Sequence, residues 1–334
     1  MKILDTTIRD GSYAVDFRFT CKDVEHICSR LEKLNIEYIE IGHGQGLNAS
    51  SQEHGYALHS DEEYLKAAKS VVGKSKIGFF CIPGIARLED LDMARQGGCD
   101  FVRIGVNANM PEQAGEFIKH AKNLGLIIMV NYMKTYIVSP EEFAKNALWA
   151  HEQGAECVYI VDSAGSMLPD ELRRYYEETR KLTNVKLGFH GHNNLGLAVS
   201  NSIYCDMIDT SMQGLGRSLG NASTEMTIMA LKKKGYDLDV DIPRLLEYGY
   251  VSLRDITDGK VQNPLDLICG YAGFHYKCCN EKNVDPLRLI LAYSEVDQRD
   301  MDYKKLCDIA EKLPEDLEDN PYTFREYFSS RYID

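Results

Sequence analysis

Short apolar runs and longer amphipathic stretches alternate along the chain from its first residues to about Gly235. The short runs are rich in β-branched residues, which is typical of buried strands. The longer stretches place apolar residues three and four positions apart, which is typical of helices that bury one face. We predict strands at Lys2–Ile8, Tyr38–Gly42, Ile77–Cys81, Phe101–Val106, Leu126–Tyr132, Cys157–Val161, Lys186–His190 and Met207–Ser211.

The amphipathic stretches also carry signals for where helices begin and end. The first helix is expected over residues 23–34, where the apolar residues fall on one face, with Thr20 as its N-cap. Asp61 is expected to open the next helix. Several helices are expected to end at glycines, which adopt the left-handed backbone that follows many helices: Gly97, Gly98, Gly125, Gly154 and Gly235.

Strict alternation predicts a parallel sheet, and eight strand–helix units predict closure into a TIM (β/α)8 barrel. An open doubly wound sheet is the alternative. Its glycine-rich dinucleotide turn is missing after the first strand, where residues 9–12 read RDGS. Beyond Gly235 the alternation stops, and helices are expected at residues 241–250, 263–271, 285–293 and 301–313. We therefore predict an α/β fold with a barrel catalytic domain over 1–240 and a small C-terminal helical domain over 241–334.

The composition, 44% hydrophobic and 27% charged residues, is that of a globular enzyme. The formal net charge of -13 argues against nucleic acid as a partner, because an acidic surface repels phosphate backbones. No apolar run reaches the roughly 18 residues of a membrane helix, and the N-terminus has no signal-peptide core. We therefore expect a cytoplasmic protein without a membrane partner. The ten cysteines include no C-x-x-C pair and are expected to be free thiols.

Active sites of TIM barrels lie at the carboxyl ends of the strands, so the polar residues there are the candidates for chemistry. These ends carry the segment 9–11 after the first strand, His43 after the second, Asp162 and Ser163 after the sixth, the segment 190–194 after the seventh and the glycine loop 214–221 after the eighth.

The seventh strand carries the main indication of a metal site. His190 and His192 are two positions apart, so both side chains point the same way. Two imidazoles and a carboxylate suit a divalent transition metal with positions left open for water or substrate. Asp10 is the carboxylate best placed to join them, since the first strand lies two strands from the seventh in a closed barrel. Arg9 is costly to bury beside them unless it faces an anion, such as a carboxylate or an enolate.

Several segments resemble the metal-dependent lyase superfamily, which holds 3-hydroxy-3-methylglutaryl-CoA lyase, isopropylmalate synthase and 4-hydroxy-2-oxovalerate aldolase. Asp5–Gly11 (DTTIRDG) is similar to the opening strand of that superfamily. Others resemble the aldolase branch: Ile39–Leu47 (IEIGHGQGL), Pro83–Ile85 (PGI), Asp162–Gly165 (DSAG), His190–Ser202 (HGHNNLGLAVSNS) and Gly270–Gly273 (GYAG). The resemblance runs from residue 3 to about residue 275 and is weaker beyond it.

The resemblance implies a metal site and a function. Mn²⁺ or Mg²⁺ would be bound by Asp10, His190 and His192, and Asn221 matches a fourth ligand of the CoA-lyase branch. The implied activity is that of a class II pyruvate aldolase. Such an enzyme cleaves a 4-hydroxy-2-oxo acid to pyruvate and an aldehyde, or forms the acid from them. Both directions pass through a metal-stabilised enolate.

The resemblance also implies which residues hold the substrate. Arg9 would stabilise the enolate oxygen of pyruvate, Ser163 and its neighbours would hold the pyruvate carboxylate, and His43 is a further expected substrate contact. The end of the substrate that becomes the aldehyde is expected to meet the segment after the fifth strand, with Asn131, Tyr132, Lys134 and Tyr136.

Two positions depart from the aldolase pattern. The family has a catalytic histidine shortly after its Asp-Gly pair, where this chain has Tyr13, and a tyrosine after Gly-Tyr-Ala-Gly, where this chain has His275. The pair looks exchanged. Our hypothesis is that His275 transfers the proton and Tyr13 orients the aldehyde end, which requires both within hydrogen-bonding reach of the substrate hydroxyl. Two neutral replacements with changed chemistry are the alternative.

Two other functions compete with the aldolase. The first is Claisen chemistry with an acyl-CoA. The synthase branch usually shows a glutamine where Tyr13 stands, and the CoA-lyase branch carries a cysteine in the glycine loop, where residues 214–218 have none. The second is a non-catalytic partner subunit, against which the intact candidate metal ligands argue. Aldolases of this branch often dock through the C-terminal domain onto an acylating aldehyde dehydrogenase, so that enzyme or a homodimer is the expected protein partner.

Overall fold

The computed structural model describes residues 1–254, 256, 292, 308–309 and 311–312. The chain divides into two compact units, Met1–Thr227 and Ile228–Asp334. The predicted domain boundary after residue 240 stays a prediction, and most of the predicted helical domain lies outside the described residues. Among the described residues, no helix is long and apolar enough to cross a membrane.

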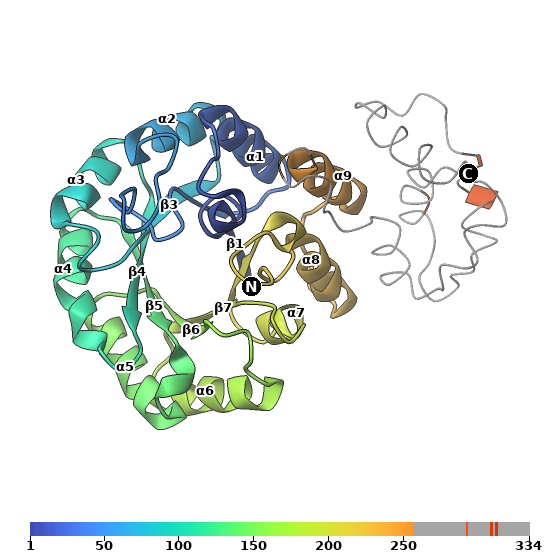
Figure 1. Cartoon of the computed structure of the whole chain (residues 1–334). Helices are drawn as coiled ribbons and strands as arrows, with labels where there is room; N and C mark the ends of the chain where they lie inside the picture. Colours follow the sequence, from blue (N-terminus) through green and yellow to red (C-terminus); the bar gives the residue numbers. More distant parts are fainter. Residues whose placement is uncertain (255, 257–291, 293–307, 310, 313–334) are drawn as a thin grey trace. The chain divides into compact units, whose positions relative to one another are not determined.

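Eight parallel strands close into a barrel in their order along the chain, and β1 completes the ring by pairing with β8 (Figure 1). The predicted TIM barrel is therefore confirmed. The strands are β1 (Lys2–Asp5), β2 (Tyr38–Ile41), β3 (Lys76–Cys81), β4 (Phe101–Asn107), β5 (Ile127–Met133), β6 (Cys157–Asp162), β7 (Lys186–Gly191) and β8 (Met207–Thr210).

Helices follow the strands, and α1 to α7 surround the barrel (Figure 1). Thr20 caps α1 as predicted, because its side chain accepts a hydrogen bond from the backbone N–H of Asp23, whose carboxylate accepts one from the N–H of Thr20. The helices are α1 (Cys21–Lys33), α2 (Asp61–Val71), α3 (Leu88–Gln96), α4 (Gly115–Asn123), α5 (Pro140–Gln153), α6 (Pro169–Leu182), α7 (Ala198–Ser202), α8 (Thr224–Lys233) and α9 (Ile242–Leu253).

Two kinds of side chain fill the barrel interior. An apolar cluster is formed by Leu4, Tyr38, Phe101, Met129, Cys157, Tyr159, Val161 and Met207. On four strands, the residue two positions after a member of this cluster is polar and buried. These residues are Glu40, Arg103, Asn131 and Asp209. Residues two apart on a strand face the same side, so these polar residues also point inward, nearer to the carboxyl ends of the strands. The fold thus places a polar layer beneath the barrel mouth.

The cysteines in the described part of the chain are free thiols, as predicted, and all of them except Cys21 are buried. Burial raises the pKa of Cys28 far above its ordinary value. A buried protonated thiol is a poor nucleophile, so these cysteines contribute packing rather than chemistry.

Candidate metal centre

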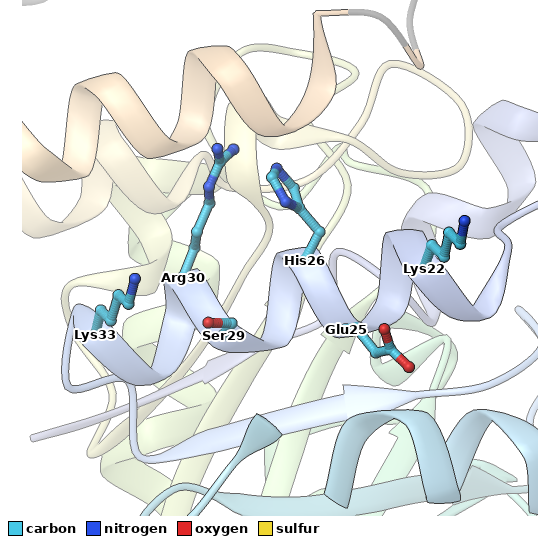
Figure 2. Close-up of a pocket in the computed structure, with 6 residues that line it drawn as sticks. All are labelled: Lys22, Glu25, His26, Ser29, Arg30 and Lys33. Carbon is cyan, nitrogen blue, oxygen red and sulfur yellow. The ribbon is translucent and has the colours of Figure 1, made fainter. Parts of the chain in front are cut away.

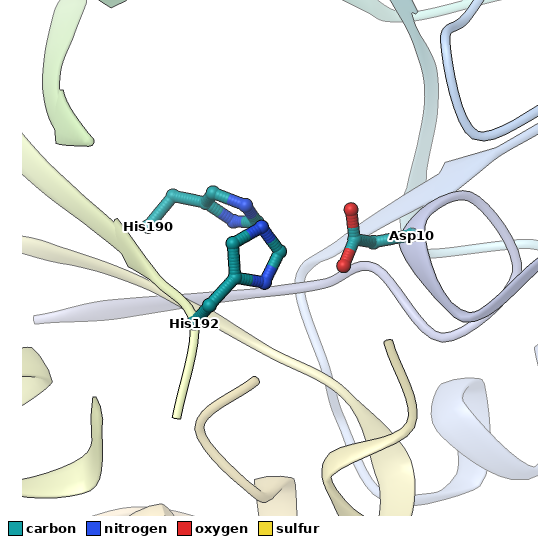
Figure 3. Close-up of side chains that lie close together, drawn as sticks. All are labelled: Asp10, His190 and His192. Atoms are coloured by element: carbon teal, nitrogen blue, oxygen red, sulfur yellow. The ribbon is translucent and has the colours of Figure 1, made fainter. Parts of the chain in front are cut away.

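Asp10, His190 and His192 come together at the carboxyl ends of β1 and β7, and all three are buried. Each offers a ligand atom, and these atoms lie within 4.8 Å of one another. Figure 3 shows both imidazole rings directed toward the carboxylate of Asp10. Asp10 begins a short 3-10 helix (Asp10–Val15), and four residues separate it from the end of β1 at Asp5. The predicted metal ligands are therefore neighbours in the fold.

The protonation states of this triad suit a cation. Burial by itself would raise the pKa of Asp10, but Arg9 and the two histidines hold it below its ordinary value. Burial lowers the pKa of His192 to about 4, so its imidazole is neutral at physiological pH. Nδ1 of His192 is buried without a hydrogen-bond partner in the described part of the chain. An ionised carboxylate with neutral imidazoles is a donor set that a divalent transition metal accepts.

Asp209, in the polar layer, orients His190. Its Oδ2 lies 3.0 Å from Nδ1 of His190, so a proton on Nδ1 is donated to the carboxylate and Nε2 is left for a metal. Burial opposes ionisation of Asp209, but Arg103 and His190 lower its pKa. Metal-binding histidines are commonly held by such a carboxylate, which fixes the tautomer and the orientation of the ring.

Arg103 is wholly buried in the polar layer and links two carboxylates. Its guanidinium donates hydrogen bonds to Glu40 and to Asp209. Arg9 and Arg103 face the carboxylates of Asp10, Glu40 and Asp209, so the buried cluster has one net negative charge when the histidines are neutral. An excess of negative charge in a buried site favours the binding of a cation. Glu40, Arg103 and Asp209 are not among the candidate residues predicted from the sequence.

Arg9 is held in the mouth with one donor group left over. Its Nε donates to Oε2 of Glu40 at 2.7 Å, and its Nη1 donates to Oδ1 of Asp10 at 2.7 Å. Nη2 is buried without a partner in the described part of the chain. The guanidinium also lies over the ring of Phe80, 4.9 Å from its centroid. A fixed guanidinium with an unused buried donor is suited to an anionic oxygen of a substrate.

Asn221 lies against the carboxylate of the triad. Its Nδ2 donates to Oδ2 of Asp10 at 2.7 Å, and its Oδ1 is buried without a partner in the described residues. The glycine loop before it packs just as closely, because a Cβ on Gly216 would lie 2.4 Å from Nδ2 of Asn221 and 2.7 Å from Oδ2 of Asp10. Asn221 is therefore within reach of a metal, and its role as a ligand stays a prediction.

Tyr13 is half-buried beside the triad, on the 3-10 helix that Asp10 begins. The ring of Tyr13 packs edge-on against Phe17, with 5.2 Å between the ring centroids. A Cβ on Gly44 would lie 2.5 Å from the Tyr13 ring. Burial raises the pKa of Tyr13, so its phenol is protonated and can donate a hydrogen bond. His275 lies outside the described residues, so the hypothesis that the two residues exchanged roles stays a prediction.

The two predicted substrate contacts lie at the ends of their strands. His43 is buried, stacks on Phe17 at 3.9 Å and accepts a hydrogen bond at Nδ1 from the N–H of Gln45. Burial lowers the pKa of His43 to about 4, so its ring is neutral. Ser163 follows β6 and accepts a hydrogen bond from the N–H of Lys134. Neither residue lies in the metal triad itself.

The residues expected to meet the aldehyde end of the substrate lie within β5 and just after it, and they differ in what they contact. Asn131 points inward, and its Oδ1 is buried without a partner in the described part of the chain. Tyr132 is fully buried, its hydroxyl donates to the carbonyl of Asn146, and its ring packs against Phe143 of α5. Because neighbouring residues on a strand alternate sides, Tyr132 stabilises the helix layer, and its expected role toward substrate is wrong. Tyr136 is exposed.

A separate hollow lies on the surface of α1 (Figure 2). Three of its six lining residues are cationic, Lys22, Arg30 and Lys33, and the others are Glu25, His26 and Ser29. It shares no residue with the metal triad, so the candidate chemistry belongs to the barrel mouth.

Comparison with known proteins gives consistent matches. The model of the HMGL-like family matches residues 1–251. An oxaloacetate decarboxylase of Mycobacterium tuberculosis is 40% identical over 250 residues, which cover 73% of this chain and 74% of that protein. A 4-hydroxy-2-oxovalerate aldolase of Carboxydothermus hydrogenoformans is 35% identical, over 82% and 84% of the two chains. The structure of hydroxymethylglutaryl-CoA lyase from Pseudomonas aeruginosa shares the fold at 17% identity, with a TM-score of 0.65 over 80% and 97% of the two chains.

Proposed function

The chain belongs to the HMGL-like family of metal-dependent carbon–carbon lyases, and on that premise we propose that it is a pyruvate aldolase. The proposed reaction cleaves a 4-hydroxy-2-oxo acid to pyruvate and an aldehyde, or runs in reverse. Curated relatives that are 33–35% identical over most of the chain are 4-hydroxy-2-oxovalerate aldolases. The observation that carries the proposal is the convergence of Asp10, His190 and His192 with Arg9, whose Nη2 is an unused buried donor.

The residues of the mouth account for the chemistry of such a cleavage. Asp10, His190 and His192 would hold a divalent cation, Mn²⁺ or Mg²⁺, which would supply Lewis acidity to the 2-oxo acid group of the substrate. Arg9 donates Nη2 to the oxygen on which negative charge develops as the enolate forms. Glu40 and Asp10 hold the guanidinium in place, so the donor needs no rearrangement during the reaction.

The proton of the substrate hydroxyl must leave as the carbon–carbon bond breaks. A base takes this proton, the C3–C4 bond electrons form the enolate of pyruvate, and the C4 oxygen becomes the carbonyl of the aldehyde. A proton then returns to C3 to give pyruvate. We propose that His275 is the base and that Tyr13, as a protonated phenol, orients the hydroxyl. Ser163, at the end of β6, is proposed to hold the pyruvate carboxylate.

Decarboxylation of a 2-oxo dicarboxylate is a second candidate, favoured by the relative from Mycobacterium tuberculosis. Loss of CO2 from C3 produces the same enolate and needs no base for a hydroxyl group. Tyr13 in place of the family's histidine is compatible with that simpler requirement. Acyl-CoA condensation remains an alternative within the family. A non-catalytic role is set aside by the family assignment, and an acylating aldehyde dehydrogenase or a second copy of the chain as partner remains a prediction.

The test is pyruvate release by protein loaded with Mn²⁺, and separately with Mg²⁺, from a series of 4-hydroxy-2-oxo acids and from oxaloacetate. A chelated sample is the control. Pyruvate formed with an equal amount of aldehyde supports the aldolase, whereas pyruvate formed only from oxaloacetate, with CO2, supports the second candidate. If no compound releases pyruvate while metal is bound, both are refuted and acyl-CoA chemistry becomes the better proposal.

A further inference from the structure

Arg217 is attached to the metal triad through its backbone. It lies in the glycine loop between β8 and α8, and its backbone N–H lies 3.3 Å from Oδ2 of Asp10, to which it donates. Gly216 on one side has no room for a side chain because Asn221 and Asp10 occupy that space. The Cα of Arg217 is therefore held within a few ångströms of a metal-binding carboxylate.

The guanidinium of Arg217 extends over the barrel mouth. It lies over the ring of Tyr13, 5.9 Å from the ring centroid. Burial is the largest influence on the pKa values of Tyr13, Tyr136 and His192, and the positive charge of Arg217 also acts on all three. These residues follow β1, β5 and β7, so the guanidinium lies at the carboxyl ends of the strands.

Arg217 is exposed, and none of the described carboxylates pairs with its charge. In the described part of the chain, its side chain takes part in no hydrogen bond and no ion pair. Arg9, the other guanidinium at the mouth, is already engaged by Asp10 and Glu40. A planar guanidinium fork binds a carboxylate through two parallel hydrogen bonds, which a lysine cannot reproduce.

We infer that the substrate carries a second carboxylate, at the end remote from its 2-oxo acid group, and that Arg217 binds it. The inference rests on the proposed aldolase and narrows its substrate to a short 4-hydroxy-2-oxo dicarboxylate. The aldehyde product then carries a carboxylate as well. Arg217 fits this reaction better than a decarboxylation, because a carboxylate that leaves as CO2 loses its charge, and an arginine bound to it opposes that loss.

The experiment compares two substrates that differ only in the group on C4, carboxylate in 4-hydroxy-2-oxoglutarate and methyl in 4-hydroxy-2-oxopentanoate. We expect the metal-loaded wild type to prefer the carboxylate in kcat/KM by about 10- to 100-fold, the range of a charged hydrogen bond. Arg217→Gln should abolish this preference through KM, and Arg217→Lys should restore part of it. The methyl substrate should react alike in all three proteins, to within about twofold.

The control is Lys122→Gln, which removes a positive charge from the last turn of α4, at the opposite end of the barrel. An unchanged substrate preference in Arg217→Gln overturns the inference, and so does an equal loss for both substrates. If neither substrate releases pyruvate, the proposed aldolase fails on its own. Calorimetric binding of 4-hydroxy-2-oxoglutarate to the wild type and to Arg217→Gln then decides the inference: weaker binding by the variant supports it, and equal binding overturns it.

Discussion

Replacing Asp209 with Asn is expected to weaken the binding of Mn²⁺ about 10- to 100-fold, the usual effect of losing a carboxylate behind a metal-binding histidine. The cost corresponds to about 1.4 to 2.8 kcal/mol of binding free energy. Oδ2 of Asp209 lies 3.0 Å from Nδ1 of His190 and also accepts from Arg103. The amide keeps the shape but removes the charge that fixes the histidine, and it cancels the net negative charge of the buried cluster.

The assay is calorimetric titration of the metal-free protein with Mn²⁺ at constant pH. Asp5→Asn is the matched control, because Asp5 is also a fully buried carboxylate of the barrel but bonds to Thr7 and Thr224 instead of a histidine. Circular dichroism should show that both variants remain folded. Unchanged Mn²⁺ affinity in Asp209→Asn, or an equal loss in Asp5→Asn, would refute the role of Asp209.

Three further perturbations have defined outcomes. Gly216→Ala should weaken Mn²⁺ binding in the same titration, because its Cβ would lie 2.4 Å from Asn221 and 2.7 Å from Asp10 and must displace them. Arg9→Lys should lower kcat for pyruvate release about 100- to 1,000-fold, because an ammonium cannot replace the fork that serves two carboxylates and the substrate. Burial raises the pKa of Asp5 from 3.8 to about 7, so the folded protein holds a proton that the unfolded chain has lost. The free energy of unfolding of the wild type, measured with urea, should therefore fall relative to that of Asp5→Asn as pH rises from about 4 to about 7.

Each of these outcomes has a control or a contradicting result. Gly73→Ala is the control for Gly216→Ala. The added Cβ at position 73 would meet only Glu32, at 3.7 Å, so the Mn²⁺ affinity should be unchanged. An Arg9→Lys enzyme with full kcat would remove Arg9 from enolate stabilisation. Parallel pH profiles of stability for the wild type and Asp5→Asn would show that Asp5 does not titrate in that range.

Much of the barrel could be predicted from local pattern because each buried strand is a short apolar run between longer amphipathic stretches. Strand ends do not follow from the same pattern. The first strand was expected to reach Ile8, but β1 ends at Asp5, where the chain turns and the N–H of Asp10 donates to the carbonyl of Thr6. That turn is set by a backbone hydrogen bond, which apolar periodicity does not reveal.

The triad could be predicted because His190 and His192 are two positions apart at the end of β7 and Asp10 follows a strand that lies near them in a closed barrel. The polar layer behind it could not, since Arg103 joins strands β2, β4 and β8, and no local pattern specifies which residues meet across a barrel. A signal was present, because a charged residue two positions after Phe101 has to point inward. Arg217 was seen only as part of a glycine loop, because its place depends on how that loop folds over Asp10.

The metal triad and Arg9 are proposed to generate the enolate of pyruvate, which is common to the aldolase and the decarboxylase. NMR of pyruvate in D2O with Mg²⁺-loaded protein tests it directly, since enolate formation exchanges the methyl protons for deuterium. We expect exchange with the wild type that disappears on chelation and in Asp10→Ala. Absence of exchange while Mg²⁺ is demonstrably bound, or undiminished exchange in Asp10→Ala, would contradict the claim.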